Sequence, residues 1–401
     1  MTPRHQRSLG RRKVLFALGG AAVAVPAAAA LAPHALAETS PGTRPAAAAA
    51  APLPLTIVNN SGSFGNANVH LYVVGNQDGR QVRLTPDGTL APVSLSDNGA
   101  DGFTDYAISL AGGGETRLSL PYMSGRIYVA LGRKLKFKAV ADGNGAAALQ
   151  YPAGWVTSDP NYGVLHDCAE FTHNSAGMFC NTTMVDMFSV PMNIRLTGSK
   201  DQSTGVFRDG GRGAVFDALR RVEAFSRLVV DDTRIIAPGH GLDAGLFDKD
   251  HLAPYIDEVW STYTGRDLRI TTNAGTFTGR VRGGRFTFDG PAQVSFGKPS
   301  TRDVLFCDGA LAAPNDGTTG PVAAVLGAGF NRSTLLSHPD QPVTDASAFY
   351  RTELTNHYSR AVHTATEDGK AYGFAFDDVA DFASYIQDTA PTGVRLTLSP
   401  F

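Results

Sequence analysis

The sequence has few cysteines and no long apolar run beyond its N-terminal region, and both absences narrow the class of protein. Three cysteines in 401 residues do not make the disulfide framework on which small exported domains depend. An apolar share of 43% suggests instead that a buried core holds the fold by itself. No segment after residue 37 offers an uninterrupted apolar stretch of about 20 residues, the length that spans a bilayer. We therefore expect the protein that follows the N-terminal region to be soluble.

Several catalytic and cofactor-binding motifs are also missing. There is no zinc-protease helix motif, no Walker loop and no Gly-x-Ser-x-Gly nucleophile elbow. The ten histidines are scattered, and none pairs with Cys, Asp or Glu at a spacing typical of a metal site. The run Gly143-x-Gly145-x-x-Ala148 has the outline of a dinucleotide-binding motif, but no strand–helix–strand unit surrounds it, so we interpret it as a loop. We expect neither a metal nor a cofactor.

The N-terminal region has the composition of an export signal. Residues 1–37 carry five basic residues and no acidic one, followed by an apolar run that ends in Ala35-Leu36-Ala37, which is the layout of a signal peptide. Arg11-Arg12 before this run indicates twin-arginine export, although Gly10 stands where a hydroxyl residue is more usual. The alternative is an ordinary secretory signal or a membrane anchor, and the glycines and alanines of the run disfavour retention in lipid. We expect cleavage after Ala37 and a secreted, extracellular protein.

Loss of this leader changes the charge of the chain. The net charge moves from −2 to about −7, because 30 basic residues then stand against 37 acidic ones. An acidic chain without a lysine or arginine block is not suited to neutralise a phosphate backbone, so we do not expect nucleic acid as a partner. Residues 38–52 are mostly Ala, Pro, Thr and Ser and form, in our interpretation, a disordered linker.

From residue 53 the chain has the pattern of a β domain. Short apolar runs are separated by turn residues, and period two with frequent turns predicts an all-β sandwich or barrel. We assign this domain to residues 53–198. Strands are expected at Leu55–Val58, Val69–Val74, Val82–Leu84, Ile127–Leu131 and Leu135–Val140.

The middle of the chain changes to a helical period. Six apolar residues between Leu252 and Tyr263 stand at positions i, i+3, i+4, i+7, i+8 and i+11. This spacing predicts a helix with one apolar stripe. We expect further helices across Val215–Val222, Pro321–Gly329 and about Ala346–Ala365, with strands at 268–272, 276–281 and 285–288. These elements predict a mixed α/β domain at residues 199–391. A last strand, within residues 392–401, is expected to return to the first domain, and no internal repeat is visible.

The segment from His166 to Asn193 concentrates polar residues among aromatic ones, a composition that suits a sugar-binding cleft. If Glu170 lies on a strand, Thr172 and Asn174 share its face because side chains alternate. A second strand from near Asn181 would run antiparallel after a turn.

That second strand would bring Asp186 to the groove that Glu170 faces. Glycosidases need such a pair, with one carboxyl protonated and the other ionised. Spacing alone leaves open the alternative that both acids are ordinary polar strand residues.

Several runs in the same order resemble one family. Glu170-Phe171-Thr172 followed by Asn181-Thr182-Thr183-Met184-Val185-Asp186-Met187-Phe188 is similar to the catalytic segment of glycoside hydrolase family 64, the laminaripentaose-producing β-1,3-glucanases related to thaumatin-like barrels. The resemblance extends over nearly all of the chain after the leader, through Ser124–Tyr128 and Tyr372–Val379. It implies a β-rich α+β protein in which a thaumatin-like β-barrel or sandwich and a mixed α/β domain form a wide groove.

The resemblance also assigns roles to residues. It implies an inverting reaction without a cofactor, in which Glu170 is the general acid and Asp186 the general base. Burial beside aromatic residues and the charge of Asp186 would favour the protonated form of Glu170. Thr172, Asn174, Phe179 and Thr183 match positions that contact glucose units, and Asp377 and Asp378 match an acidic pair from the α/β domain.

Two features depart from the family pattern. Phe179 stands where the resemblance leads us to expect tryptophan, so an apolar face remains but the indole donor is lost. Cys168 and Cys180 are unusual in this segment, and either they form a disulfide bridge or all three cysteines, including Cys307, are buried thiols.

The expected function is that of a monomeric, secreted endo-β-1,3-glucanase that releases short oligosaccharides, with laminaripentaose as the expected product. The alternatives are a non-catalytic thaumatin-like glucan-binding protein and a hydrolase of another β-glucan or of peptidoglycan.

Overall fold

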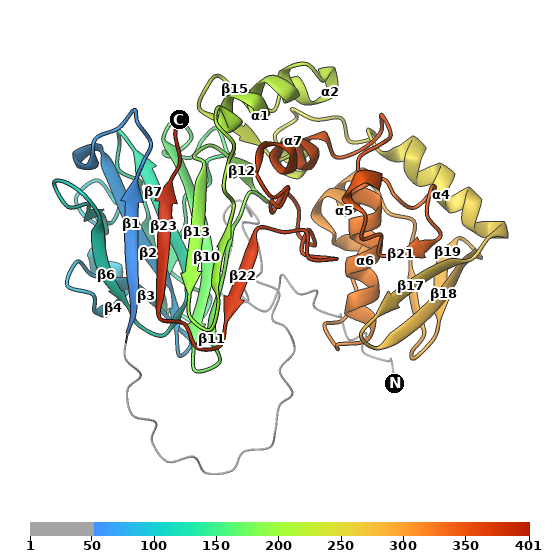
Figure 1. Cartoon of the computed structure of the whole chain (residues 1–401), viewed down its shortest axis with the longest axis horizontal. Coiled ribbons are helices and arrows are strands. Elements are labelled where there is room, and N and C mark those ends of the chain that lie inside the picture. Colours follow the sequence, from blue (N-terminus) through green and yellow to red (C-terminus); the bar gives the residue numbers. More distant parts are fainter. Residues whose placement is uncertain (1–51) are drawn as a thin grey trace, which may run out of the picture.

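The computed structural model describes residues 52–401 (Figure 1). The predicted signal peptide, and the predicted linker apart from Pro52, lie outside the described residues. None of the helices within residues 52–401 is both long and apolar enough to cross a membrane.

Two open sheets packed face to face form the β domain. The five-stranded sheet has the order β14 (Asp201–Thr204), β13 (Met192–Thr197), β23 (Gly393–Leu398), β1 (Leu53–Asn59) and β6 (Thr116–Leu120). The eight-stranded sheet has the order β22 (Tyr385–Asp388), β11 (Gly177–Thr182), β10 (Leu165–Asn174), β7 (Met123–Leu131), β2 (Val69–Gln77), β3 (Arg80–Leu84) and β4 (Leu90–Pro92), with β5 (Ile108–Ser109) paired to β2. Both sheets end in edge strands, so the described residues form a sandwich and no closed barrel.

The alternation of side chains explains why these strands pack in this way. Leu55 of β1, Val73 of β2 and Phe171 of β10 all point into one apolar core between the two sheets. The residues between them point away from that core because successive side chains of a strand face opposite sides. The β8 (Lys138–Ala141) and β9 (Ala147–Gln150) strands form a separate hairpin. Its turn contains Gly143 and Gly145, the glycines of the run that has the outline of a dinucleotide-binding motif.

The α/β domain is built around a second apolar core beside the sandwich (Figure 1). Its helices are α1 (Gly211–Arg220), α2 (Glu223–Ser226), α3 (Pro238–Asp243), α4 (Ala253–Gly265), α5 (Thr301–Phe306), α6 (Thr319–Asn331) and α7 (His357–Ala365). Its three-stranded sheet has the order β12 (Met187–Phe188), β16 (Arg234–Ile236) and β15 (Val229–Val230). Its five-stranded sheet has the order β20 (Val294–Phe296), β19 (Arg285–Asp289), β18 (Gly275–Arg282), β17 (Leu268–Thr272) and β21 (Asp340–Gln341). Short 3-10 turns lie at Asn66–Asn68, Leu95–Asp97, Gly309–Leu311 and Ala346–Ala348.

The apolar stripe predicted between Leu252 and Tyr263 faces this second core. Trp260 and Tyr263 of α4 each pack on Phe286 of β19, with ring centroids 5.5 Å apart. Gly283 and Gly284, both with positive φ, make the turn between β18 and β19, a conformation that glycine adopts without a steric penalty.

Two predicted elements are wrong in part. The predicted strand Leu135–Val140 begins only at Lys138, because the amide of Leu135 donates to the hydroxyl of Tyr72 and the amide of Lys136 donates to Asn161. The side chains of Tyr72 and Asn161 thus accept the backbone hydrogen bonds that a neighbouring strand would otherwise accept.

The predicted helix over Ala346–Ala365 is interrupted between Ala348 and His357. Tyr350 has a φ of 57°, which a right-handed helix cannot contain. The side chain of Asn356 accepts a hydrogen bond from the amide of Ser359 at 3.0 Å and so caps the start of α7.

The chain crosses from one domain to the other more than once. Residues 183–191, which we call the crossing segment, leave the sandwich after β11 and return to it at β13. Within this segment Met184 and Phe188 are buried in the core of the α/β domain. The sandwich takes in β14, up to Thr204, and also β22, so both lie outside the bounds expected for the β domain.

The C-terminal strand completes the five-stranded sheet. β23 lies between β1, to which it is parallel, and β13, to which it is antiparallel, so Leu396 stands opposite both Ile57 and Ile194. Two neighbouring strands therefore depend on the last residues of the chain for their hydrogen bonds.

We predict that Leu396→Ala lowers the free energy of unfolding by roughly 2–5 kcal/mol, because it leaves a cavity in a packed core. Leu396 is 1% exposed, whereas the neighbouring Thr397 is half-buried on the opposite face of β23. Thr397→Ala is the matched control and should cost less than about 1 kcal/mol. Chemical denaturation followed by circular dichroism measures both, and equal losses would contradict the assigned faces of β23.

Candidate active site

A row of polar side chains crosses the outward face of the eight-stranded sheet. β10 turns Ala169 and Phe171 into the core, which leaves Glu170 on the opposite face. The strand register places Glu170 between Arg126 of β7 and Asn181 of β11. Cross-strand partners of this kind have neighbouring side chains on the same face, so the three polar groups form one row.

Glu170 is held by two neighbours in this row. Its Oε1 accepts from Nε of Arg126 at 3.0 Å and pairs with Nη2 at 2.9 Å, whereas its Oε2 has only a long contact, 3.4 Å, with Nδ2 of Asn181. The side chain of Glu170 is 4% exposed. A proton on this carboxyl group would therefore reside on Oε2, because two nitrogens of Arg126 already lie within 3.0 Å of Oε1.

The surroundings of Glu170 favour that proton. Burial raises the pKa of Glu170 above its ordinary value, the guanidinium of Arg126 acts in the opposite direction, and the negative charge of Asp186 raises the pKa further. The net direction is upward, since the ionised form is costly in a buried site. Glu170 and Asp186 are thus close enough to influence each other electrostatically.

Asp186 is not on the strand predicted for it. β11 begins at Gly177 and ends at Thr182, before Asp186 is reached, because the strand pairs with β22 only as far as Asn181. Asp186 lies instead in the crossing segment, one residue before β12.

The α/β domain holds the backbone around Asp186. The carbonyl of Asp186 accepts from the amide of Ala237 at 3.1 Å, and the amide of Met184 donates to the carbonyl of Tyr372 at 2.9 Å. The hydroxyl of Tyr358 donates to the carbonyl of Met184 at 2.6 Å. The segment that carries Asp186 is thus tied to α3, to α7 and to the chain after α7.

The side chain of Asp186 also has a partner from the α/β domain. Nε2 of His240, on α3, lies 2.7 Å from Oδ1 of Asp186. The side chains of His240 and Asp186 are 3% and 14% exposed. The imidazole stacks on Trp155 with centroids 4.5 Å apart and meets the edge of Phe306, so it is held on both sides.

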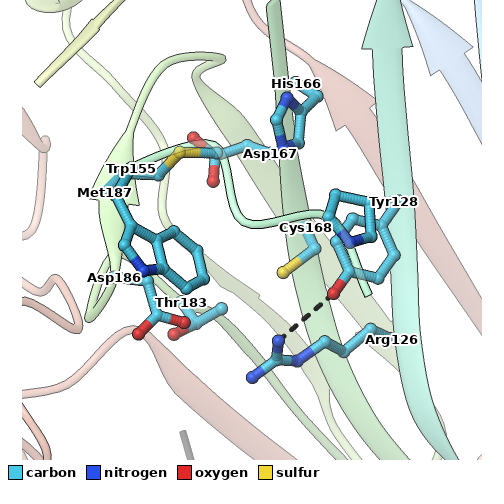
Figure 2. A pocket seen from close by; sticks show the side chains of 10 residues that line it. Arg126, Tyr128, Trp155, His166, Asp167, Cys168, Thr183, Asp186 and Met187 are labelled. Carbon is cyan, nitrogen blue, oxygen red and sulfur yellow. Dashed lines mark hydrogen bonds between the residues drawn. The ribbon is translucent and has the colours of Figure 1, made fainter. Parts of the chain in front are cut away.

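A small cavity of about 20 Å³ is lined by Asp186 and by Arg126, the partner of Glu170 (Figure 2). Arg126 and Tyr128, joined by a hydrogen bond, lie on one side of it in this view, and Trp155 and Asp186 lie on the other. Nε1 of Trp155 and Nε2 of His166 line the cavity region and have no hydrogen-bond partner among the described residues. A cavity of this volume has room for about one water molecule.

Four predicted sugar-binding residues lie around the acidic pair. Thr172 and Phe179 are cross-strand partners on the face that carries Glu170, and Thr172 accepts a hydrogen bond from Ser124 at 3.0 Å. Asn174 is exposed at the end of β10, where its side chain accepts from the amide of Ala176 in the turn. Thr183 lines the cavity.

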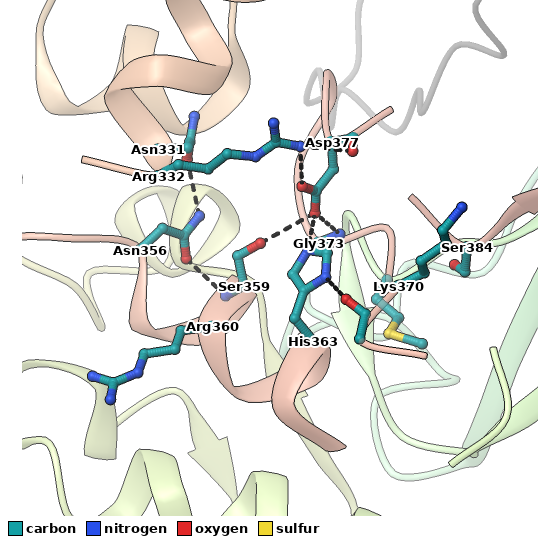
Figure 3. A network of polar contacts seen from close by, with 12 residues as sticks. Asn331, Arg332, Asn356, Ser359, Arg360, His363, Lys370, Gly373, Asp377 and Ser384 are labelled. Atoms are coloured by element: carbon teal, nitrogen blue, oxygen red, sulfur yellow. Dashed lines mark hydrogen bonds and ion pairs between the residues drawn. The ribbon is translucent and has the colours of Figure 1, made fainter. Parts of the chain in front are cut away.

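Asp377 is placed differently from these residues (Figure 3). Its carboxylate has no exposed surface and is bound by Arg332 at 3.1 Å, His363 at 2.8 Å, Ser359 at 3.2 Å and the amide of Gly373 at 2.9 Å. Burial alone would raise the pKa of Asp377, but His363 and Arg332 hold it below its ordinary value. As placed, Asp377 joins α6, α7 and the chain that follows them, and these partners enclose its carboxylate.

Asp378 lies nearer to the sheet. It is half-buried, and its charge contributes to the raised pKa values of Tyr372 and of Tyr385 on β22, in both cases after the larger effect of burial. Asp378 is therefore close to the edge of the sheet that carries Glu170.

Cys168 and Cys180 do not form a disulfide bridge. Cys180 faces the core between the sheets and is opposite Phe171, whereas Cys168 shares the outward face with Glu170 and lines the cavity. Two side chains on opposite faces of a sheet cannot be joined without movement of the backbone. Cys307 is buried in the α/β domain.

Residue patterns did not identify the partners of the two acids. Arg126 could have been found, because Arg126 and Tyr128 alternate with the apolar Ile127 and Val129 along β7 and so predict a polar face. His240 follows Asp186 by 54 residues, and no spacing in the sequence relates the two. Among residues 52–401, no group of three or more His, Cys, Asp or Glu side chains is arranged to hold a metal ion.

Comparison with known proteins gives consistent matches over most of the chain. The model of glycoside hydrolase family 64, described as Beta-1,3-glucanase, matches residues 51–398. A protein of Cellulosimicrobium cellulans named Glucan endo-1,3-beta-glucosidase is 34% identical over 377 residues, which cover 89% of this chain and 67% of that protein.

Solved structures agree with these matches. A laminaripentaose-producing beta-1,3-glucanase in complex with laminaritetraose is 37% identical, with a TM-score of 0.79, and the match covers 88% of this chain and 99% of that one. A beta-1,3-glucanase domain from Clostridium beijerinckii is 28% identical, with a TM-score of 0.76 and coverage of 87% and 98%.

The electrostatics around the cavity can be tested at Asp167, which also lines it. Its Oδ2 accepts from the amides of Ser189 and Val190, and burial raises the pKa of Asp167 to about 7. The pKa of Asp167 is higher in the folded state than in the unfolded state. The contribution of Asp167 to the free energy of unfolding is therefore complete below the unfolded pKa of about 4 and is lost as the pH rises through 7.

We predict that Asp167→Asn removes this loss of stability. Between pH 4 and pH 7 the wild type should lose on the order of 4 kcal/mol relative to the variant, since each pKa unit corresponds to about 1.4 kcal/mol. Thermal or chemical denaturation of both proteins across this range measures the difference. Parallel pH dependences would show that Asp167 ionises normally in the folded protein.

Proposed function

The chain belongs to glycoside hydrolase family 64, the β-1,3-glucanases, and on that premise we propose that it hydrolyses β-1,3-glucan of the laminarin or curdlan type by an inverting mechanism. The observation that carries this proposal is the presence of two carboxyl groups in different surroundings, close enough that the charge of Asp186 raises the pKa of Glu170. Glu170 is buried and its pKa is raised, whereas Asp186 accepts a hydrogen bond from His240. A glycosidase needs one protonated and one ionised carboxyl group.

Glu170 serves as the general acid. It donates its proton from Oε2 to the glycosidic oxygen as the bond from that oxygen to the anomeric carbon breaks. Arg126 holds Oε1 through two nitrogens, which fixes the orientation of the carboxyl group. The same guanidinium stabilises the carboxylate that remains after proton transfer, because it supplies the opposite charge at hydrogen-bond distance.

Asp186 serves as the general base. It takes a proton from a water molecule whose oxygen forms the new bond to the anomeric carbon, on the side opposite to the departing oxygen. One proton leaves Glu170 and one reaches Asp186, so the protons balance over the reaction. The small cavity that Asp186 lines has room for a water molecule at this place.

The glucan chain lies, in this proposal, in a groove between the outward face of the eight-stranded sheet and the α/β domain, as in a thaumatin-like arrangement. Thr172, Asn174 and Thr183 supply hydroxyl and amide groups for sugar hydroxyls, and Phe179 supplies an apolar face for a sugar ring. Asp378 is an additional contact from the α/β domain. The laminaripentaose-producing enzyme among the similar structures supports laminaripentaose as the main product.

The remaining proposals concern the cell. Export through the twin-arginine signal of residues 1–37 and action as a secreted monomer are consistent with a polysaccharide substrate, which is too large to enter a cell. Cleavage after Ala37 is tested by sequencing the N-terminus of the protein recovered from the culture medium.

We predict that Glu170→Gln and Asp186→Asn each lower turnover of laminarin at least 100-fold, because a positioned acid or base supplies about 10²–10⁴-fold. Both substitutions keep the size of the side chain, so folding and binding of glucan should remain close to those of the wild type. A reducing-sugar assay measures turnover, and binding to insoluble glucan is the control. Hydrolysis within tenfold of wild type by either variant would contradict the catalytic role assigned to that residue. No hydrolysis by the wild type would favour a glucan-binding protein that does not catalyse.

We predict that the first product formed from the β-linked substrate is the α-anomer. A single displacement by water inverts the anomeric carbon, whereas a retaining enzyme would form a covalent intermediate and release the β-anomer. Proton NMR at early times distinguishes the anomers before they equilibrate in solution. Early appearance of the β-anomer would make Asp186 a nucleophile and leave the substrate assignment intact.

A further inference from the structure

The two acids belong to different structural frameworks. Glu170 is part of β10 and is held by Arg126 of the neighbouring strand, so the sandwich alone fixes its position. Asp186 is held through its backbone by Ala237 and through its side chain by His240. Both of these residues belong to the α/β domain.

The local sequence around His240 fits a tightly packed site. His240 lies in the run Pro238-Gly239-His240-Gly241 of α3. A Cβ atom on Gly239 would lie 3.0 Å from the ring of Phe306, and one on Gly241 would lie 2.2 Å from a methyl group of Leu228. Glycine on each side therefore lets the helix approach its neighbours closely enough for the imidazole to reach Asp186.

The imidazole has little freedom to turn. Its ring is stacked on Trp155 at an interplanar angle of 23° and meets Phe306 at 82°. Trp155 precedes β10, in the part of the chain assigned to the β domain, whereas Phe306 ends α5. His240 is thus clamped between one aromatic residue from each domain, and its ring plane is fixed relative to the sheet that carries Glu170.

We propose that His240 is the positioning residue of the catalytic base. Nε2–H of the imidazole donates to Oδ1 of Asp186 and so orients the carboxylate that accepts the proton of the attacking water. Since a carboxylate can rotate about its bond to Cβ, a single strong donor from a rigid ring selects one of its orientations. This role depends on the proposed function of Asp186 as the general base.

Substitution of His240 tests the proposal. We predict that His240→Ala lowers kcat for laminarin about 10- to 100-fold and changes KM less than threefold, because the imidazole contacts the base and not the sugar. In the Asp186→Asn background the same substitution should lower kcat less than threefold further, since the group that His240 positions is already disabled.

Two amide variants separate positioning from packing. The amide nitrogen of a glutamine at position 240 reaches about as far from the backbone as Nε2 of histidine, whereas that of asparagine is one carbon shorter. His240→Gln should recover at least tenfold of the lost kcat and His240→Asn should not. Because both variants lose the same aromatic contacts with Trp155 and Phe306, their difference reports the hydrogen bond even if His240→Ala does not fold.

A matched control exists in the same domain. His363 also lies with Nε2 2.8 Å from an aspartate, Asp377, and stacks on an aromatic ring, that of Phe382, with centroids 4.4 Å apart. His363→Gln should lower the melting temperature and leave kcat within twofold of the wild type.

The outcomes distinguish this inference from the proposed function. A wild type that does not hydrolyse laminarin overturns the proposed function. A wild type that does, together with an impaired Asp186→Asn and a His240→Ala that keeps kcat within threefold, overturns only the inference. Equal kcat values for His240→Gln and His240→Asn overturn it as well, because the hydrogen bond would then have no effect.

Discussion

Asp186 reaches the face of the sheet only because the chain leaves the sandwich between β11 and β13 and inserts side chains into the other core. Phe188 stacks on Phe207 with centroids 5.1 Å apart, and Met184 is buried beside it. On the sandwich side, Oδ2 of Asp167 accepts hydrogen bonds from the amides of Ser189 and Val190, the two residues after Phe188. The crossing segment is thus anchored at both ends, and the distance between the two acids follows from how the two cores are packed against each other.

This arrangement places the carboxyl groups of Glu170 and Asp186 in surroundings that differ in burial and in hydrogen-bond partners. Glu170 is placed among strands, where burial is nearly complete and a single guanidinium offsets part of the cost of ionisation. Asp186 is more exposed, at 14%, and its Oδ1 lies 2.7 Å from Nε2 of His240. The difference in burial and in partners therefore comes from the positions of the two residues in the fold.

The parts of the site that could be predicted are those fixed by local geometry. Alternation along one strand placed Glu170 and Thr172 on a common face, since this depends only on neighbouring residues. The end of β11 could not be predicted in this way, because Tyr358 and Tyr372, far along the chain, fix the backbone at Met184. The helix expected from Ala346 had the right apolar spacing, but the positive φ of Tyr350 and the capping side chain of Asn356 divide it. The sequence left a barrel and a sandwich both open, because strand patterns specify alternation and do not specify closure; the described residues form an open sandwich.

The position of β23 has a consequence for how the protein folds during synthesis. This strand forms hydrogen bonds with β1, near the start of the described chain, and with β13, and it is translated after every other strand of the two sheets. Until it emerges, β1 and β13 lack the strand that separates them and present unpaired backbone groups, which favour association with other chains. Contacts between such distant segments also slow folding. A chain truncated before Gly393 would carry both acids and their partners and still lack a completed five-stranded sheet.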